Sequence, residues 1–156
     1  MRHVVLVVLA TLGIAGCAAQ AARDPAPAPA APAASSQQSV PGDLRGTDWR
    51  FVEVEGLRVP DGVNATLRLR EGRASGKAGC NSYGASWEIT ADGGTRFGET
   101  MSTRMACLEP TGAMQVERGV FNALQHATRL RRDGETLVML DASGKPLAKL
   151  TPDNTP

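Results

Sequence analysis

The sequence predicts an α+β domain dominated by antiparallel β-sheet. Between about residues 43 and 151, short segments of alternating apolar and polar residues recur with glycine-rich turns between them. Short strands at such close spacing favour antiparallel pairing over strand-helix-strand crossovers. One segment, residues 109–127, instead repeats its apolar residues three and four positions apart. The order of strands, one helix and further strands is that of an α+β domain.

The strand segments share a period of two. The first contains Trp49, Phe51 and Val54 and ends at a turn beginning with Glu55. Residues 65–70, ATLRLR, alternate leucine with arginine. Alternation continues in residues 83–89, YGASWEI, and after the helical segment two more strand regions are expected in 128–141 and 144–152. Such alternation predicts strands with one apolar and one polar face.

The helical segment has an apolar stripe formed by Met114, Val116, Val120, Phe121 and Leu124. This spacing predicts one amphipathic helix that packs on the sheet. We expect Thr111 to cap its N-terminus, because a threonine hydroxyl can accept a hydrogen bond from the first free backbone amides. We expect Glu117 and Arg118 to face solvent.

Residues 1–16 are expected to be a lipoprotein signal peptide. Arg2 precedes an uncharged apolar run that ends at Ile14, too short to span a bilayer comfortably. The run leads into IAGC, which resembles the bacterial lipobox and makes Cys17 the expected lipidation site. Several acyl chains there would anchor the protein to the membrane. Ala18 after the cysteine favours the outer membrane, with the protein facing the periplasm, while a soluble periplasmic protein is the alternative.

Residues 17–42 are expected to be a disordered linker, because they are rich in alanine and proline and nearly free of large apolar side chains. The folded domain is expected to span residues 43–151, with a disordered tail at 152–156. The chain has 17 basic and 16 acidic residues. Such a neutral chain lacks the basic stripe that nucleic-acid binding requires, so we expect no nucleic-acid partner.

Several motifs together resemble the META domain family of HslJ-like proteins. They are LRGTDWRFVEVEG at the domain start, GCNSYGASWEI, STRMACLEP, ERGVFNALQ and DGETLVMLD. The resemblance covers residues 44 to about 150. It implies a compact antiparallel sheet, curved or barrel-like, around one helix. It also implies a location in the cell envelope and a link to stress and drug tolerance, without an established enzymatic reaction.

The expected domain contains two cysteines, Cys80 and Cys107, which can form one disulfide in an oxidising compartment. A catalytic thiol is the alternative. It would need a base within hydrogen-bonding distance, and His126 at the end of the expected helix is the one histidine after the signal peptide. Ser82 is a weaker candidate nucleophile, since no glycine elbow surrounds it. We expect no catalytic residues and no enzymatic activity.

Four sulfur-bearing residues could instead form a soft copper(I) site: Met101, Met105, Cys107 and Met114. Methionine also fills irregular cores, and oxidation of Cys107 would remove the best ligand. We therefore expect no metal and no cofactor.

Four polar or aromatic residues flank the two cysteines and are candidates for contact with a ligand or partner: Asn81, Tyr83, Arg104 and Glu109. Asn81 could equally tie a local turn, and Arg104 and Glu109 could form an ordinary surface ion pair. The partner would be an unidentified envelope protein or a small molecule. We expect a stress-related structural or interaction module, with a binding protein for a small hydrophobic molecule as the alternative.

Overall fold

The computed structural model describes residues 44–154. The expected signal peptide, the expected lipidation site Cys17 and the expected linker to residue 42 lie outside the described residues. Within the described part, no helix combines the length and the apolar character needed to cross a bilayer.

Ten strands and one helix follow one another along the described chain. The first five strands are β1 (Thr47–Val54), β2 (Leu57–Arg58), β3 (Thr66–Arg70), β4 (Arg73–Lys77) and β5 (Ser82–Ile89). They are followed by β6 (Thr95–Phe97), β7 (Met101–Ser102), helix α1 (Ala113–His126), β8 (Arg129–Asp133), β9 (Thr136–Leu140) and β10 (Pro146–Pro152). The order confirms an α+β fold.

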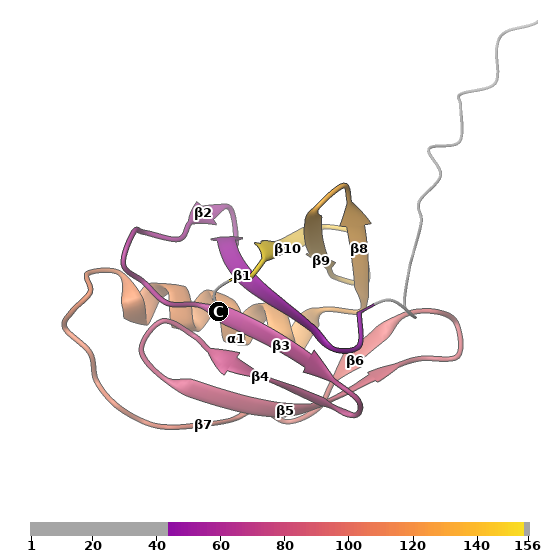
Figure 1. Cartoon of the computed structure of the whole chain (residues 1–156), viewed down its shortest axis with the longest axis horizontal. Coiled ribbons are helices and arrows are strands. Elements are labelled where there is room, and N and C mark those ends of the chain that lie inside the picture. Colours follow the sequence, from indigo (N-terminus) through magenta and orange to yellow (C-terminus); the bar gives the residue numbers. More distant parts are fainter. Residues whose placement is uncertain (1–43, 155–156) are drawn as a thin grey trace, which may run out of the picture. The chain divides into compact units, whose positions relative to one another are not determined.

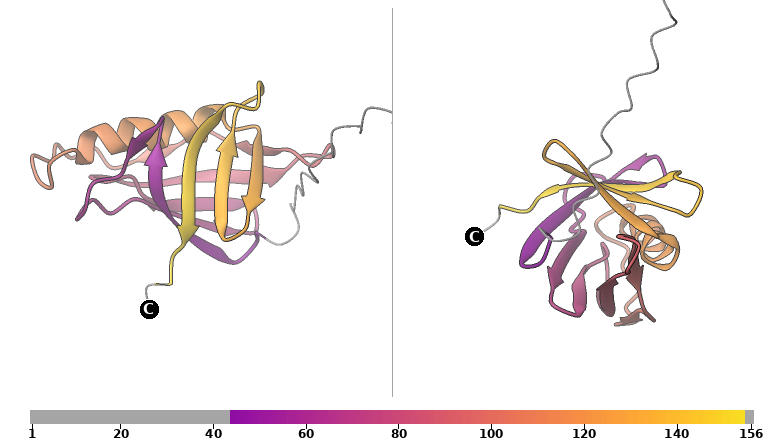
Figure 2. Two further views of the ribbon diagram at one scale, coloured as in Figure 1. Left: turned by 90° about the horizontal axis from the view of Figure 1, so that it is seen from above. Right: turned by 90° about the vertical axis from the view of Figure 1, so that its right-hand side faces the viewer.

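All strand pairs are antiparallel, and the main sheet has the order β6-β5-β4-β3-β1-β10-β9-β8. The strands β2 and β7 pair only with β1 and β5 respectively. The pairing of β1 with β10 joins the beginning and end of the domain, as Figures 1 and 2 show. The sheet curls into a nearly closed barrel, and the backbone amide of Thr95 donates to the Thr128 carbonyl at 2.8 Å where the two edges meet.

The core lies inside the curl and beneath α1. In β3 the expected alternation is present, since Leu67 and Leu69 are buried while Arg68 and Arg70 are exposed. The largest fully buried side chains come from both halves of the sheet and from the helix: Trp49, Phe51, Leu44, Leu67, Leu69, Leu124, Leu137, Met139 and Leu150. These large side chains occupy the inside of the sheet.

Helix α1 packs closely on β1. A Cβ atom added at Gly119 would lie 2.9 Å from Cβ and 2.8 Å from Cγ2 of Val54, so a larger residue would force the helix or Val54 to shift. The N-cap residue is Gly112, with φ of 88°, and it makes no side-chain capping bond. The expectation that Thr111 caps the helix is therefore wrong. Its hydroxyl and amide instead donate to the carboxylate of Glu109, which lies before the helix.

The ordered domain continues beyond the expected boundary at residue 151. Strand β10 extends to Pro152, which pairs with Trp49, and the amide of Asp153 donates to the Asp48 carbonyl at 2.9 Å. The Asp153 carboxylate also forms an ion pair with Arg50 at 2.9 Å. Residues 152 and 153 therefore belong to the folded domain and not to a disordered tail.

Candidate interaction site

A disulfide between Cys80 and Cys107 joins the motif GCNSYGASWEI to the loop between β7 and α1, which contains most of the motif STRMACLEP. Their Cα atoms are 5.8 Å apart across a sequence separation of 27 residues. Both sulfurs are bonded to each other, so neither is a thiolate nucleophile or a thiolate ligand in this structure.

The side chain of Asn81 also holds this loop in place through hydrogen bonds. Its side-chain oxygen accepts hydrogen bonds from the Met105 amide at 2.8 Å and from the Thr103 hydroxyl at 2.7 Å. Its side-chain nitrogen donates to the Met105 carbonyl at 3.1 Å. The residue is 1% exposed, so these bonds form in the interior, where unpaired polar groups are costly.

Glu117 completes this buried network from helix α1. Its Oε2 atom accepts bonds from the backbone amide of Asn81 at 2.9 Å and from the Asn81 side chain at 2.8 Å. The expectation that Glu117 faces solvent is wrong, since the residue is only 8% exposed. The helix, strand β5 and the 103–105 backbone thus meet at one asparagine.

The segment 101–108 is held by these bonds but presents apolar side chains to solvent. Met101 is 78% exposed, Met105 is 54% exposed and Leu108 is 92% exposed. They are three of the four large hydrophobic side chains that are exposed in the described part of the chain, and the fourth is Leu57 on β2. We call Met101, Met105 and Leu108 the apolar rim.

The four candidate contact residues divide into two groups. Asn81 and Tyr83 are buried, and the Tyr83 hydroxyl donates to the Thr66 carbonyl at 2.8 Å. Burial raises the pKa of Tyr83 far above its ordinary value. Both residues are therefore not open to a partner, whereas Arg104 and Glu109 are exposed and flank the apolar rim in sequence.

The structure also shows the residues of the catalytic-nucleophile hypothesis and of the copper(I) hypothesis. The ring of His126 makes a hydrogen bond with the Asn122 carbonyl at 3.0 Å on the exposed side of α1. Ser82 lies on β5, where its amide donates to the Thr103 hydroxyl. Among residues 44–154, no three histidine, cysteine or acidic side chains gather closely enough to hold a metal ion. Met101 and Met105 point into solvent.

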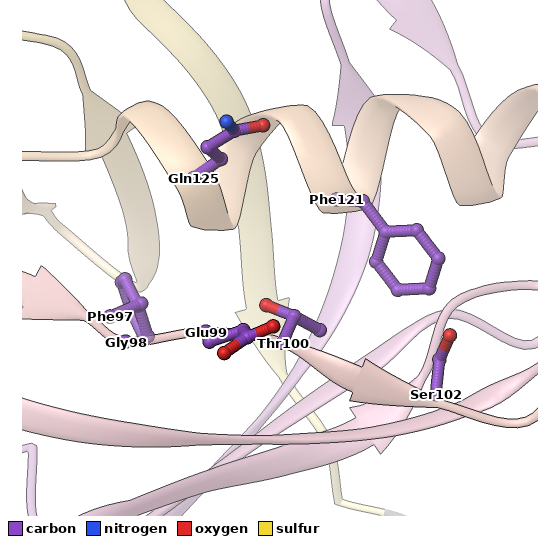
Figure 3. Close-up of a pocket in the computed structure, with 7 residues that line it drawn as sticks. All are labelled: Phe97, Gly98, Glu99, Thr100, Ser102, Phe121 and Gln125. Atoms are coloured by element: carbon purple, nitrogen blue, oxygen red, sulfur yellow. The ribbon is translucent and has the colours of Figure 1, made fainter.

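A cleft of about 470 Å³ lies between α1 and the connection from β6 to β7. Figure 3 shows Phe121 extending from the helix toward Thr100 and Ser102, with Gln125 one turn further along the helix and Phe97 and Glu99 on the strand side. Phe121 also packs edge-on against Tyr83, with ring centroids 6.1 Å apart. The cleft is thus adjacent to the disulfide-bonded loop and has one aromatic residue on each wall.

The sequence interpretation missed Glu117 as part of this site. A signal was present: Glu117 shares a helix face with Ala113, Val120 and Leu124, which are all buried. A carboxylate on the buried face of a helix needs hydrogen-bond donors from a neighbouring element. Asn81 supplies them across 36 residues of sequence.

Comparisons with known proteins agree with this fold. The family model described as META domain matches residues 42–154. An NMR structure of a protein from Burkholderia xenovorans is 28% identical, with a TM-score of 0.57 over 72% of this chain and 85% of that chain. A second NMR structure is 18% identical, with a TM-score of 0.57 over 72% of this chain and 93% of that one.

A crystal structure of a DUF4847 family protein from Bacteroides vulgatus is 11% identical, with a TM-score of 0.52 over 73% of this chain and 97% of that chain. The last two similarities concern the fold alone. No curated protein sequence matches significantly. Because the family model covers residues 42–154, most of the chain, this protein belongs to the META domain family.

Proposed function

We propose that this protein is a lipid-anchored META-domain protein of the cell envelope and serves as a non-enzymatic interaction module. The apolar rim of Met101, Met105 and Leu108 is its contact surface. The observation that carries the proposal is the exposure of these three side chains on a backbone held by the Cys80–Cys107 disulfide and Asn81. The partner is an envelope protein with an apolar patch of its own.

The energetics of binding favour this surface. Large exposed apolar side chains gathered on one segment are typical of protein contact sites. Binding normally costs free energy because loops must be ordered, and a loop already held by a disulfide and internal hydrogen bonds avoids much of that cost. Arg104 and Glu109 would form the polar edge of the contact and contribute to its orientation.

The proposed anchor rests on the lipobox-like sequence that ends at Cys17. A linker of alanine and proline would hold the domain away from the membrane and allow it to reach a partner. A role in stress or drug tolerance is part of the proposal, by analogy with the family.

The contact is tested by photo-crosslinking in intact cells. A photoreactive phenylalanine replaces Leu108 in one full-length protein and Leu57 in another, since both positions hold exposed leucines on different parts of the domain. We expect one discrete adduct from position 108 and a different, weaker pattern from position 57. Identical patterns from the two positions, or no adduct from position 108, would contradict the proposal.

A second candidate function is binding of a small hydrophobic molecule in the cleft between α1 and the 97–102 segment. Phe97 and Phe121 on its two walls are the observation that favours it, because ligand sites combine aromatic walls with a few polar groups. The inside of the sheet is occupied by core side chains, so the cleft is the better location.

The cleft hypothesis is tested without detergent, with N-phenyl-1-naphthylamine, a fluorescent apolar probe, and the full-length chain carrying Cys17→Ala in place of the proposed anchor residue. A Gln125→Trp variant would fill the cleft, whereas an Arg118→Trp variant adds the same ring elsewhere on the exposed helix. Loss of probe binding only in Gln125→Trp supports the hypothesis, and equal probe binding by both variants contradicts it.

A further inference from the structure

The outer face of four neighbouring strands carries an unusual number of basic side chains. Figure 1 shows β1, β3, β4 and β5 side by side. Their solvent face holds Arg50, Arg68, Arg70, Arg73 and Lys77, which we call the basic face. Between these side chains the face is lined by small residues of β4 and β5: Ser75, Ser82, Gly84 and Ser86.

Two of these cations are paired with carboxylates. Arg70 lies 2.9 Å from the Asp48 carboxylate, and Arg50 lies 2.9 Å from that of Asp153. None of the ion pairs among the described residues involves the other three cations. Arg68, Arg73 and Lys77 therefore leave an excess of positive charge on this part of the face, while Glu88 at the end of β5 is paired with Arg96 at 3.6 Å.

Strand register brings Arg50, Arg68 and Lys77 together. Arg50 pairs with Thr66 across β1 and β3, and Lys77 pairs with Ser82 across β4 and β5. Arg68, two residues beyond Thr66, pairs with Ser75. Because diagonal neighbours on one face of a sheet lie within reach of long side chains, the three cations surround Thr66.

This arrangement encloses a shallow hollow of about 460 Å³. The cations in its lining are Arg50, Arg68 and Lys77. The lining also includes the hydroxyl-bearing Ser75 and Ser82 and the amide-bearing Asn64. Asp153 also lines it, with its carboxylate paired to Arg50. Arg73 extends the positive charge toward β5, since its Nη2 atom lies 3.6 Å from the position that a Cβ of Gly84 would take.

We propose that this hollow binds a phosphate group. A phosphate presents several acceptor oxygens and negative charge, and guanidinium groups with added hydroxyl and ammonium donors match both. The ligand is a phosphate ester or diphosphate, or the phosphodiester headgroup of an anionic lipid. This site is distinct from the apolar rim and does not depend on the interaction proposed there.

Binding is measured by NMR on the ¹⁵N-labelled full chain in a maltoside detergent. Pyrophosphate is titrated in one series. Glycerophosphoglycerol, the headgroup of phosphatidylglycerol without its acyl chains, is titrated in the other. We expect saturable shifts of the Ser75, Lys77 and Ser82 amides at millimolar concentrations, while Gly134 in the distant β8–β9 turn stays constant. Saturable shifts with glycerophosphoglycerol identify a lipid headgroup as the source of the phosphate, and saturable shifts with pyrophosphate alone identify a phosphate ester or diphosphate.

The matched variants separate a site from general charge attraction. An Arg68→Gln/Lys77→Gln double variant should bind at least about tenfold more weakly, because two charged donors are lost. An Arg118→Gln/Lys145→Gln variant loses the same charge at exposed positions elsewhere and should stay within about twofold of the original Kd. Equal weakening in both variants, or no saturable shift with either ligand, would overturn the proposal.

Discussion

Asn81 is the residue on which the candidate interaction site depends most. Its buried side chain makes bonds to Glu117, Thr103 and both backbone groups of Met105. Replacement by alanine would remove one of the two donors to the buried Glu117 carboxylate oxygen and would leave the Met105 amide without its acceptor. Removing one partner of a buried polar group costs more than the bond itself contributes.

We therefore expect Asn81→Ala to lower the free energy of unfolding by about 2 to 4 kcal/mol. Urea denaturation at neutral pH measures the loss. Asn122→Ala is the control, because the Asn122 side chain makes an exposed bond to Glu55 and its loss should cost less than about 1 kcal/mol. A cost for Asn81→Ala no greater than that of the control would contradict this role.

Asp141 stabilises a turn in a pH-dependent way. The hydrogen bond from the Ser143 hydroxyl, followed by the bond from the Lys145 amide, lowers the pKa of Asp141 below its ordinary value. A carboxyl whose pKa is lower in the folded state stabilises the fold above its unfolded pKa, and this stabilisation disappears as the pH falls through the folded pKa.

We expect Asp141→Asn to destabilise the protein at neutral pH and to lose this difference progressively below about pH 4. Melting temperatures of the variant and the parent at several pH values test the expectation. A difference that stays constant down to the lowest pH at which the protein folds would rule out the titration of Asp141 as its source.

At the scale of elements, the disulfide connects the start of β5 to the loop before α1. In the chain-entropy model, closing a loop of 27 residues stabilises the fold by about 3 to 4 kcal/mol. We expect Cys80→Ala/Cys107→Ala to lower the free energy of unfolding by about that amount. Hydrogen exchange should also become faster in the 101–108 segment. Strands β8, β9 and β10 serve as the internal control, and equal acceleration there would contradict a local role for the disulfide.

Helix α1 provides a second test at this scale. In an exposed helix, replacing glycine by alanine gains up to about 1 kcal/mol. At Gly119 the added Cβ would meet the Val54 side chain below 3.0 Å. We therefore expect Gly119→Ala to destabilise the protein by about 1 to 3 kcal/mol, as measured by urea denaturation. A gain in stability would show that the contact between α1 and β1 is looser than described. Gln115→Ala, at an exposed helix position, should be nearly neutral.

The elements with a clear local period were predictable from the sequence, whereas their long-range partners were not. Strand β3 was predictable because Leu67 and Leu69 alternate with arginines. The pairing of β1 with β10 joins segments about one hundred residues apart, and alternation does not specify which strand is the neighbour. Likewise, the sequence shows Asn81 as a polar residue beside a cysteine, but its partner Glu117 belongs to another element. Two-residue strands such as β7 are too short to show a period.

At the scale of the whole molecule, the proposed anchor and the folded domain have separate roles. The domain has a complete core within residues 44–154, and none of its described contacts requires the membrane. We expect full-length Cys17→Ala to keep the melting temperature of the parent domain but to move from the membrane fraction to the soluble periplasmic fraction. Cell fractionation with immunodetection measures this, and a variant that stays in the membrane fraction would disprove anchoring through Cys17.

The most direct test of the central claim is the native mass of the protein when it is extracted from envelopes with a mild detergent. If the apolar rim binds a partner, the wild-type protein should migrate in a complex larger than a single chain, whose mass before processing is 16.3 kDa. Met105→Ser/Leu108→Ser should release it, while Leu57→Ser should not. Migration of the wild type as a free chain, or a complex that survives in the double variant, would contradict the claim.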